Sequence, residues 1–526
     1  MDNKLGIVIK IFLLLSLFFF INADLQAQKK IRFSANWSYH DEDRLPGVNR
    51  LIGNVIFTQG EIIGYCDSAY FHERENVMEA FGRKVKIHIN DSVTLYGKYV
   101  IYNGNTKMAS ISREVVLEDN TSSLYTDSLI YNLNTDVGYY VTGGKMINQD
   151  NTLTSKLGRY FTQEQMIYLN ENVLLVNETY TMTCDSLAFN TDDEIVHFLS
   201  RTHLNSEEND IYTTFGWYDT KQDIAELVKD VIIISETQKI TGDSIYYDKN
   251  GKLGIGWNNV SVSDSVKNYI LNGHYVEYFE GEGVSMATDS AMVVLIDGRD
   301  SLFVHADTFK IYIDSLRDVE LLKAYYHTKF FREDIQGAAD SMVYVSADSL
   351  LTLYYNPVIW SEEYQLTGDT IQFFMIDSVR VEVRLRRSGF VVSSIYNDLE
   401  FNQIKGINIT GHIYDKKLKK VDVIGNAECL YYIQEDDASL IGVNSSATSE
   451  MKISFVDNQI QTITKYNEPD GKIYPDQLLE ENDKRLKDFR WLETYRARRV
   501  EDIFHTPIPR IKGSEPGAGP FSDRNR

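Results

Sequence analysis

The 526-residue sequence is poor in cysteine, proline and positive charge. Its three cysteines leave at least one thiol without a disulfide partner. Only 8 prolines accompany 43% hydrophobic and 12% aromatic residues, which is typical of a folded, strand-rich chain. The formal net charge of -23 argues against nucleic acid as a partner, because phosphate binding requires a basic surface.

The sequence also lacks the signatures of the common catalytic sites. It contains no GxSxG, HExxH, P-loop or paired CxxC motif. Asp-Ser recurs many times, but the ten histidines stand at no fixed offset from it, so no Ser–His pair is indicated. Acidic residues are so numerous that no single carboxylate pair for glycoside cleavage can be picked out. We therefore predict no enzyme activity, no metal and no cofactor.

An apolar run is found at the N-terminus, where Ile11 to Ile21 reads IFLLLSLFFFI after Lys4 and Lys10. Its 11 residues are about half of the ~20 that a spanning helix needs, so a signal peptide is favoured over an uncleaved anchor. We expect cleavage after Ala27. No cysteine follows the run, so the attachment of a lipid to a new N-terminal cysteine is not supported.

The Asp-Ser pairs belong to a repeat. Those that begin at Asp67, Asp127, Asp185 and Asp243 follow at intervals of 60, 58 and 58 residues. Midway between them a glycine takes the same place in the pattern, at Gly97, Gly158, Gly216 and Gly273. The period is therefore about 30 residues, and a repeat of that length indicates one stacked body. After Gly273 the Asp-Ser and Asp-Thr pairs come closer together, which predicts shorter or irregular repeats there.

Each repeat reads as strand, polar turn, strand, bend and strand. KVKIHI (84–89) is the clearest β-strand, with Val85, Ile87 and Ile89 on one face. Asp-Ser at a strand start is explained by a carboxylate that accepts hydrogen bonds from backbone N–H groups at the bend. O-glycosylation of Asp-Ser and Asp-Thr sites is the minor alternative. A 30-residue β unit cannot bury its apolar face alone, so the units must stack into an elongated all-β body.

The repeat also decides the cysteine question. Four units separate Cys66 from Cys184, which corresponds to about 19 Å at roughly 4.8 Å for each unit. A disulfide requires Cα atoms within about 7 Å, so we predict none between them.

The composition changes after Pro475. PDQLLEENDKRLKDFRWLETYRARRVEDIF has no β-alternation and predicts a helix, followed by a disordered tail. The predicted organisation is a signal peptide (1–27), β repeats (28–375), further β repeats or a second β module (376–470), and a helix with a tail (471–526).

The export signal, GEIIGYCDSAYFHERENVMEAFGRKVKIHINDSVTLYGKYVIYN (60–103) and the 30-residue units that follow resemble the OstA-like (organic solvent tolerance) family, which is related to LptA and to the N-terminal domain of LptD. The resemblance implies a twisted β-jellyroll whose apolar groove carries the acyl chains of lipopolysaccharide across the periplasm for outer-membrane assembly. It also implies end-to-end strand addition to other jellyroll proteins; self-association and association with the outer membrane stay open.

We expect inward-facing residues of the strands to line that groove. They are Val85, Ile87, Leu117, Leu129, Tyr131, Val173, Leu175, Leu187, Phe189, Ile245 and Tyr247. The alternative is that they fill a dry core. Two other functions are also consistent with the repeats: a structural or adhesive β-solenoid that binds polysaccharide on its outer face, and a carbohydrate-active β-helix enzyme. A filled interior with aromatic rows outside would favour the solenoid, and a V-shaped cross-section that is open along its length would favour lipid transport.

Overall fold

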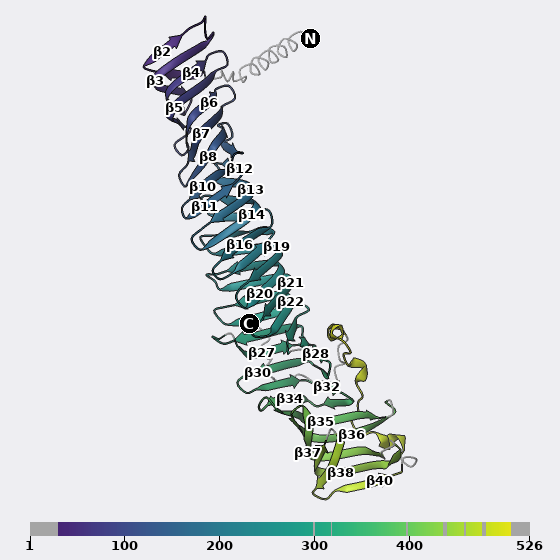
Figure 1. Cartoon of the computed structure of the whole chain (residues 1–526). Helices are drawn as coiled ribbons and strands as arrows, with labels where there is room; N and C mark the ends of the chain where they lie inside the picture. The colour runs from purple at the N-terminus through teal and green to yellow at the C-terminus, as the bar shows by residue number, and fades with distance from the viewer. Residues whose placement is uncertain are drawn as a thin grey trace, which may run out of the picture. The chain divides into compact units, whose positions relative to one another are not determined.

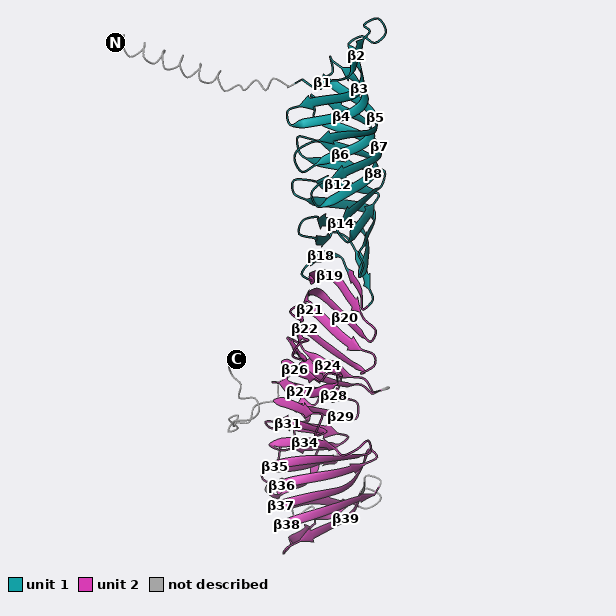
Figure 2. Cartoon of the chain, turned by 90° about the vertical axis from the view of Figure 1, so that its left-hand side faces the viewer, with its two compact units in different colours: residues 1–207, 213–222 teal, residues 208–212, 223–526 magenta. Residues whose placement is uncertain are grey.

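The computed structural model describes residues 30–297, 300–316, 318–395, 398–434, 439–456, 459–475 and 480–505. The predicted signal peptide and the predicted disordered tail after residue 505 lie outside these residues. The chain divides into two compact units (Figure 2). Unit 1 comprises Met1–Glu207 and Thr213–Gln222, and unit 2 comprises Glu208–Tyr212 and Asp223–Arg526. The domain boundaries drawn from the sequence, at residues 375 and 470, stay predictions.

Unit 1 is built from β-strands (Figure 1). They are β1 (Arg32–Ser34), β2 (Trp37–His40), β3 (Val48–Gln59), β4 (Ile62–His72), β5 (Val77–His88), β6 (Thr94–Asn103), β7 (Met108–Glu118), β8 (Ser122–Asn132), β9 (Val137–Tyr140), β10 (Gly144–Asn148), β11 (Asn151–Ser155), β12 (Leu157–Phe161), β13 (Met166–Val176), β14 (Tyr180–Asn190), β15 (Ile195–Phe198), β16 (Thr202–Ser206) and β18 (Phe215–Asp219).

Unit 2 is built from strands of the same kind and three short 3-10 helices. The strands are β17 (Asp210–Thr213, of which 210–212 belong to this unit), β19 (Ile224–Ile234), β20 (Gln238–Asp248), β21 (Leu253–Asp264), β22 (Tyr269–Phe279), β23 (Val284–Thr288), β24 (Met292–Leu295), β25 (Leu302–His305), β26 (Thr308–Ile313), β27 (Val319–Tyr325), β28 (Thr328–Arg332), β29 (Ile335–Ala339), β30 (Ser341–Val345), β31 (Leu350–Tyr354), β32 (Val358–Ser361), β33 (Tyr364–Thr367), β34 (Thr370–Met375), β35 (Arg380–Ile395), β36 (Glu400–Tyr414), β37 (Lys417–Gln434), β38 (Leu440–Val456), β39 (Gln459–Tyr466) and β40 (Asp470–Tyr474). The 3-10 helices are η2 (Glu481–Lys484), η3 (Glu493–Tyr495) and η4 (Val500–Phe504). In the described part of the chain we find no helix with the length and hydrophobicity that a membrane crossing requires.

The long strands bend near their middle. Against β5, the register of β4 shifts between Tyr65 and Ser68, so the strand has two straight halves. On the alternate strands two consecutive residues adopt positive φ at the bend, as Arg113 (68°) and Glu114 (53°) do in β7. Each half pairs with the matching halves of its neighbours, which produces two walls that are joined at the bends. Wall I contains the Ser68–His72 half of β4 in unit 1 and the Ile224–Val228 half of β19 in unit 2; wall II contains the other halves.

Asp-Ser marks these bends. The prediction that it opens a strand is wrong for the long strands, because Asp67 and Ser68 lie in the middle of β4. It is correct for three shorter strands, since β26, β30 and β34 begin directly after Asp307, Asp340 and Asp369. The predicted chemistry is present at this site, since Asp67 Oδ2 accepts a hydrogen bond from the backbone N–H of Arg83 across the bend of the next strand (2.8 Å). A repeat of about 30 residues is therefore two antiparallel bent strands. The predicted all-β architecture of stacked repeats is confirmed.

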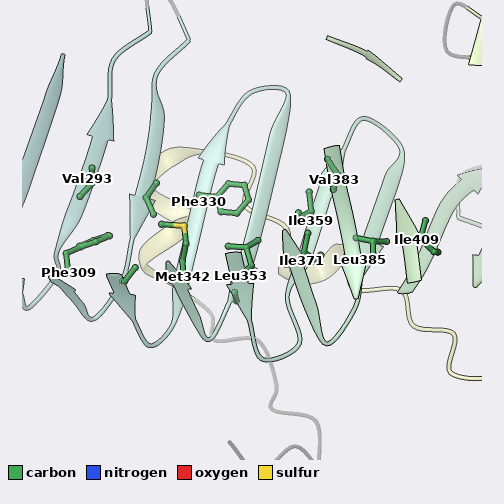
Figure 3. Packing of buried hydrophobic residues seen from close by; sticks show 14 of the residues in the cluster. Val293, Phe309, Phe330, Met342, Leu353, Ile359, Ile371, Val383, Leu385 and Ile409 are labelled. Atoms are coloured by element: carbon green, nitrogen blue, oxygen red, sulfur yellow. The ribbon is translucent and has the colours of Figure 1, made fainter. Parts of the chain in front are cut away.

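The core of each unit lies between its two walls. In wall I of unit 2, antiparallel pairing places one interior residue of each strand in a continuous row. Figure 3 shows several of these side chains pointing into the space between the walls. The row contains Val276, Ala287, Phe309, Ala324, Met342, Leu353, Ile371, Leu385 and Ile409. Small residues on both sides of Phe309, Ala287 and Ala324, leave room for its ring in this row.

The continuous helix expected after Pro475 is not formed. Residues 480–505 instead form η2, η3 and η4, joined by extended segments, and they cover the outer face of wall II in unit 2. We name residues 480–505 the strap. The side chain of Gln403 in wall II forms hydrogen bonds with the carbonyl of Lys484 and the N–H of Leu486 in the strap. These backbone groups are therefore not available for the hydrogen bonds of an α-helix.

All three cysteines are free, as predicted for Cys66 and Cys184. Cys66 and Cys429 are buried and Cys184 is partly buried. Burial raises the pKa of the Cys66 thiol to about 12 and the pKa values of the Cys184 and Cys429 thiols to about 11. The thiolate, which is the reactive form, is therefore scarce at neutral pH.

We predict that the native protein reacts slowly with a thiol-specific reagent such as DTNB at pH 8. Cys184 should react first because it is the least buried of the three, and all three thiols should react at once in denaturant. Immediate reaction of three thiols in the native protein would contradict the described packing.

Candidate functional site

The eleven residues predicted to line a groove lie on interior faces of the walls, in distinct rows. Ile87, Leu117 and Leu175 belong to one row of wall II in unit 1. Wall I of unit 1 holds Leu129 and Leu187 in one row and Tyr131 and Phe189 in the next; Val85 and Val173 lie beside the bends of wall II; Ile245 and Tyr247 lie in wall I of unit 2. The structure thus places the eleven residues on two interiors, one in each unit.

The interior of unit 1 is filled. The nine predicted residues in this unit are all at most 2% exposed. Glycine makes room for large rings here: a Cβ built on Gly64 would lie 2.0 Å from Phe57 Cζ, and one on Gly158 would lie 2.3 Å from the ring of Tyr140. Contacts also cross between the walls, because a Cβ on Gly138 of wall I would lie 3.4 Å from Leu117 Cδ1 of wall II. In the described structure, the nine predicted residues of unit 1 are therefore core residues.

Polar side chains close the unit 1 interior along the edge opposite the bends. Buried Gln59 of wall II donates to the carbonyl of Gly104 beyond wall I (2.8 Å). Further along, buried Asn148 donates to the carbonyl of Thr191 (2.9 Å). We name these cross-wall contacts the seam. Its members are the pairs Ile31–Asn76, Gln59–Gly104, Gln59–Tyr102, Asp119–Tyr160, Asn148–Thr191 and Asn151–Glu194.

The interior of unit 2 is exposed in its first strands. Tyr247 faces inward, two residues from buried Ile245, and yet 39% of its surface is exposed. Ala225 and Gly254 flank it on the neighbouring strands, and a Cβ on Gly254 would meet nothing closer than Tyr247 Cδ2, at 4.0 Å. On wall II, Ile233, Ile240 and Val262 occupy one interior row and are each only partly buried. We name the space bounded by these residues the trough.

The sequence analysis found Ile245 and Tyr247 but missed the small residues that flank Tyr247. Ala225, Gly254 and Ser285 stand in the same register row as Tyr247 and Tyr278. The equivalent row of unit 1 has the same alternation, with Ala109 and Gly138 between Tyr102, Tyr131 and Tyr160, and there the tyrosines are fully buried. The two interiors therefore differ in how the tyrosine is covered, and not in the size of its neighbours along the row.

Charge at the trough is negative. Burial raises the pKa of Tyr247, and the nearby carboxylates of Glu280, Glu208 and Asp223 raise it further. The trough therefore combines apolar walls with an acidic surround. A ligand with an apolar chain fits the walls, and anionic groups of that ligand near these carboxylates would require a counter-cation. Within the described residues, His, Cys, Asp and Glu side chains form no group of three that could hold a metal ion.

The outer face of wall II in unit 1 carries a row of tyrosine and lysine side chains. Tyr65, Lys86, Tyr96, Val116, Tyr125 and Lys145 are successive register partners on neighbouring strands. Lys84 Nζ lies 3.9 Å from the ring centroid of Tyr96, in cation–π geometry. A hollow of about 450 Å³ lies beside Tyr125 and is lined in part by Glu114, Asp127 and Lys145. This outer row therefore combines three tyrosines with two lysines and Val116.

Comparison with known proteins bears on the described strands of unit 1. Residues 31–185 match the family model of the OstA-like protein. This segment is therefore similar to the OstA-like family. The predicted resemblance is thereby confirmed for residues 31–185, which contain the seam contacts from Ile31–Asn76 to Asp119–Tyr160.

Comparisons with solved structures and with curated proteins add little to the similarity found for residues 31–185. The chain is similar to LptH from Pseudomonas aeruginosa, described as the LptA homologous periplasmic component of the conserved lipopolysaccharide transport device. The identity is 15%, the match covers 21% of this chain and 81% of that chain, and the TM-score is 0.20. The comparison with curated proteins found no match.

A pair of glycine variants tests the contrast between the two interiors. Gly64→Ala should lower the free energy of unfolding by about 1–3 kcal/mol, because its methyl group would overlap the Phe57 ring. Gly254→Ala, the matched control, should change it by less than about 0.5 kcal/mol because the added methyl group has room. Urea unfolding followed by tryptophan fluorescence measures both. Equal destabilisation by the two variants would show that the unit 2 interior is as filled as that of unit 1.

Proposed function

We propose that this OstA-like protein binds lipopolysaccharide in the periplasm and shields its acyl chains between the two walls during outer-membrane assembly. The observation that carries the proposal is the trough, an inward apolar surface that is partly exposed at Tyr247, Ile233, Ile240 and Val262. The family of residues 31–185 supports it. The proposal includes periplasmic location after signal cleavage and binding without enzymatic turnover.

The energetics of acyl-chain burial favour such a role. Each CH₂ group removed from water contributes about 0.8 kcal/mol, so a 14-carbon chain gains roughly 10 kcal/mol between apolar walls. The seam of unit 1 opposes entry with a small number of hydrogen bonds, each worth about 1 kcal/mol net. The burial of an acyl chain between the walls of unit 1 would therefore offset the cost of opening part of the seam. In this scheme the buried residues of unit 1, such as Ile87 and Leu117, are contacts of a loaded state.

Partners at the ends of the sheets are part of the proposal. Among the described residues, β1 and β2 pair with β3 alone, and β39 and β40 pair with β38 alone. The other edge of each of these strands offers backbone groups to an added strand. Such edges suit end-to-end joining to other jellyroll proteins or to a second copy.

A second function is favoured by one observation. The unit 1 interior is filled, and the outer row from Tyr65 to Lys145 combines aromatic and basic residues beside a hollow. A structural or adhesive β-solenoid that binds polysaccharide would use this outer row and leave the interior dry.

Site-specific photo-crosslinking separates the two functions. A photoreactive amino acid replaces Ile240 or Tyr247 in the trough, or Tyr125 on the outer row, in cells that make lipopolysaccharide. Lipid transport predicts adducts that contain lipid A at positions 240 and 247, and none at 125. Adducts at position 125 alone would favour the solenoid, and no lipid adduct at 240 and 247 would overturn the transport proposal.

Retention of lipid through size-exclusion chromatography provides a quantitative measure. Tyr247→Asp should reduce the lipopolysaccharide that co-elutes with the protein at least about tenfold, because a charge in the trough opposes acyl-chain burial. Tyr125→Asp, an exposed tyrosine of similar accessibility (41% against 39%), is the control and should leave retention unchanged. Ile87→Asp is unsuitable because Ile87 is 1% exposed and the variant would unfold the wall.

A further inference from the structure

The strap crosses the outer face of wall II in unit 2 in a regular way. Buried Gln403 of β36 donates to the carbonyl of Lys484 (2.9 Å) and accepts from the N–H of Leu486 (2.8 Å). Buried Gln365 of β33 does the same six residues later: it donates to the carbonyl of Arg490 (2.8 Å) and accepts from the N–H of Leu492 (2.6 Å). Gln403 and Gln365 therefore each form hydrogen bonds with one carbonyl and one N–H of the strap backbone.

A third glutamine continues the series. Gln336 of β29 is buried and accepts a hydrogen bond from Arg496 Nε (2.6 Å), again six residues along the strap. The three glutamines lie in a single register row of wall II, in which an apolar residue follows each of them. The row is Gln336, Trp360, Gln365, Val392, Gln403 and Leu430. Successive glutamines are two strands apart, which is about 9.6 Å.

The strap sequence has a matching six-residue period. KRLKDF (484–489) and RWLETY (490–495) share a basic residue at position 1, leucine at position 3 and an aromatic residue at position 6. Six extended residues would span about 20 Å, so each hexad must fold back to match a spacing of about 9.6 Å. The required turns are present: the N–H of Phe489 donates to the carbonyl of Leu486 (3.1 Å), and that of Tyr495 donates to the carbonyl of Leu492 (2.9 Å).

Apolar side chains of the strap fill the spaces between the glutamines. Leu486, Phe489 and Trp491 pack against buried Phe390 and Phe401. In the second hexad, Leu492 and Tyr495 pack against the cluster of Ala338, Val358 and Trp360. Aromatic anchors in such pockets supply most of the affinity in peptide recognition.

Ion pairs hold the start of the strap. Glu400 accepts hydrogen bonds from Lys484 (2.9 Å), Arg485 (3.3 Å) and Tyr432 (2.6 Å). Burial alone would raise the pKa of Glu400, but these hydrogen bonds outweigh burial and hold the pKa below its usual value. The Arg485 guanidinium also stacks over the rings of Phe401 (4.8 Å) and Phe489 (5.1 Å).

We propose that this outer face is a docking site for hexad peptides, with the strap as its resident ligand, and that the C-terminal segment of a second copy of this chain can occupy it in exchange. Gln403 and Gln365 bind backbone groups of the strap, so recognition depends on register and on the leucine and aromatic anchors. The strap forms no β-ladder with the wall, so it can leave without breaking the sheet. The strap is part of the same chain as the wall, so its effective concentration at the wall is high. Cutting the chain before the strap would make the intrinsic affinity of the strap for the wall measurable.

The test uses the full chain with a protease site inserted after Pro475. The folded protein is cut and then mixed with a fluorescein-labelled synthetic peptide of residues 480–505. We expect the labelled peptide to replace the strap, with saturable binding by fluorescence anisotropy, while circular dichroism keeps the β signal of the uncut protein. Mixing cut protein with uncut chains should then give a species that contains both, by size exclusion.

Glutamine variants show whether the hydrogen bonds are used as proposed. Gln365→Ala should raise the Kd of the peptide at least about tenfold, because it removes two hydrogen bonds at once. Gln365→Glu keeps the acceptor for the N–H of Leu492 but places a buried carboxylate oxygen against the carbonyl of Arg490, so its Kd should rise at least as much as that of Gln365→Ala. Gln372→Ala, on wall I away from the strap, is the matched control and should bind as the original protein does.

Three outcomes would overturn the proposal. They are loss of the β signal after cutting, a cut strap that the peptide does not replace, and equal peptide affinity of the Gln365→Ala and Gln372→Ala variants. None of them bears on lipid adducts at positions 240 and 247, so this proposal and the proposed function fail separately.

Discussion

The packing of two walls against each other across a bend in every long strand is the interaction on which this protein depends. A single wall is a half-buried sheet that cannot protect its apolar face. The bend brings two halves of the same strand into contact through their side chains, so every strand contributes to both sides of the core. Asp-Ser, glycine and paired positive-φ residues such as Arg113 and Glu114 serve this one requirement, which is why they recur in step with the repeat.

The same framework yields two kinds of interior. In unit 1, tyrosines such as Tyr131 and Tyr160 reach across to the polar seam, and glycines leave the space that the rings need. The first strands of unit 2 have the same alternation of tyrosine with small residues, as in Ala225, Tyr247 and Gly254, but Tyr247 keeps 39% of its surface exposed. A filled core and a surface that a ligand can reach therefore differ in how the tyrosine is covered, and not in the size of its neighbours along the row.

The outer faces follow a different rule. Where wall II of unit 2 carries Trp360, Phe390 and Phe401 outward, the strap covers them. Buried polar groups require partners, and Gln365 and Gln403 find theirs in the strap backbone. The spacing between strands of wall II thus sets the six-residue period of the strap, which contains no β-strand. The strap does not form an α-helix, because a helix would use its backbone groups in its own hydrogen bonds and would not place them opposite these glutamines.

Alternation and spacing along the chain were sufficient to predict the all-β class, the repeat of about 30 residues, the absence of a Cys66–Cys184 disulfide and the inward faces of strands such as β5 and β7. The sequence by itself placed Ile87, Leu117 and Tyr131 on interior faces correctly, since period-2 alternation assigns a residue to a face. Which interior is open could be known only from the tertiary structure, because the exposure of Tyr247 depends on neighbours on other strands, such as Ala225 and Gly254. The tertiary structure also decided the conformation of residues 480–505: their local pattern favours a helix, and contacts with a wall more than 80 residues earlier in the chain override that preference.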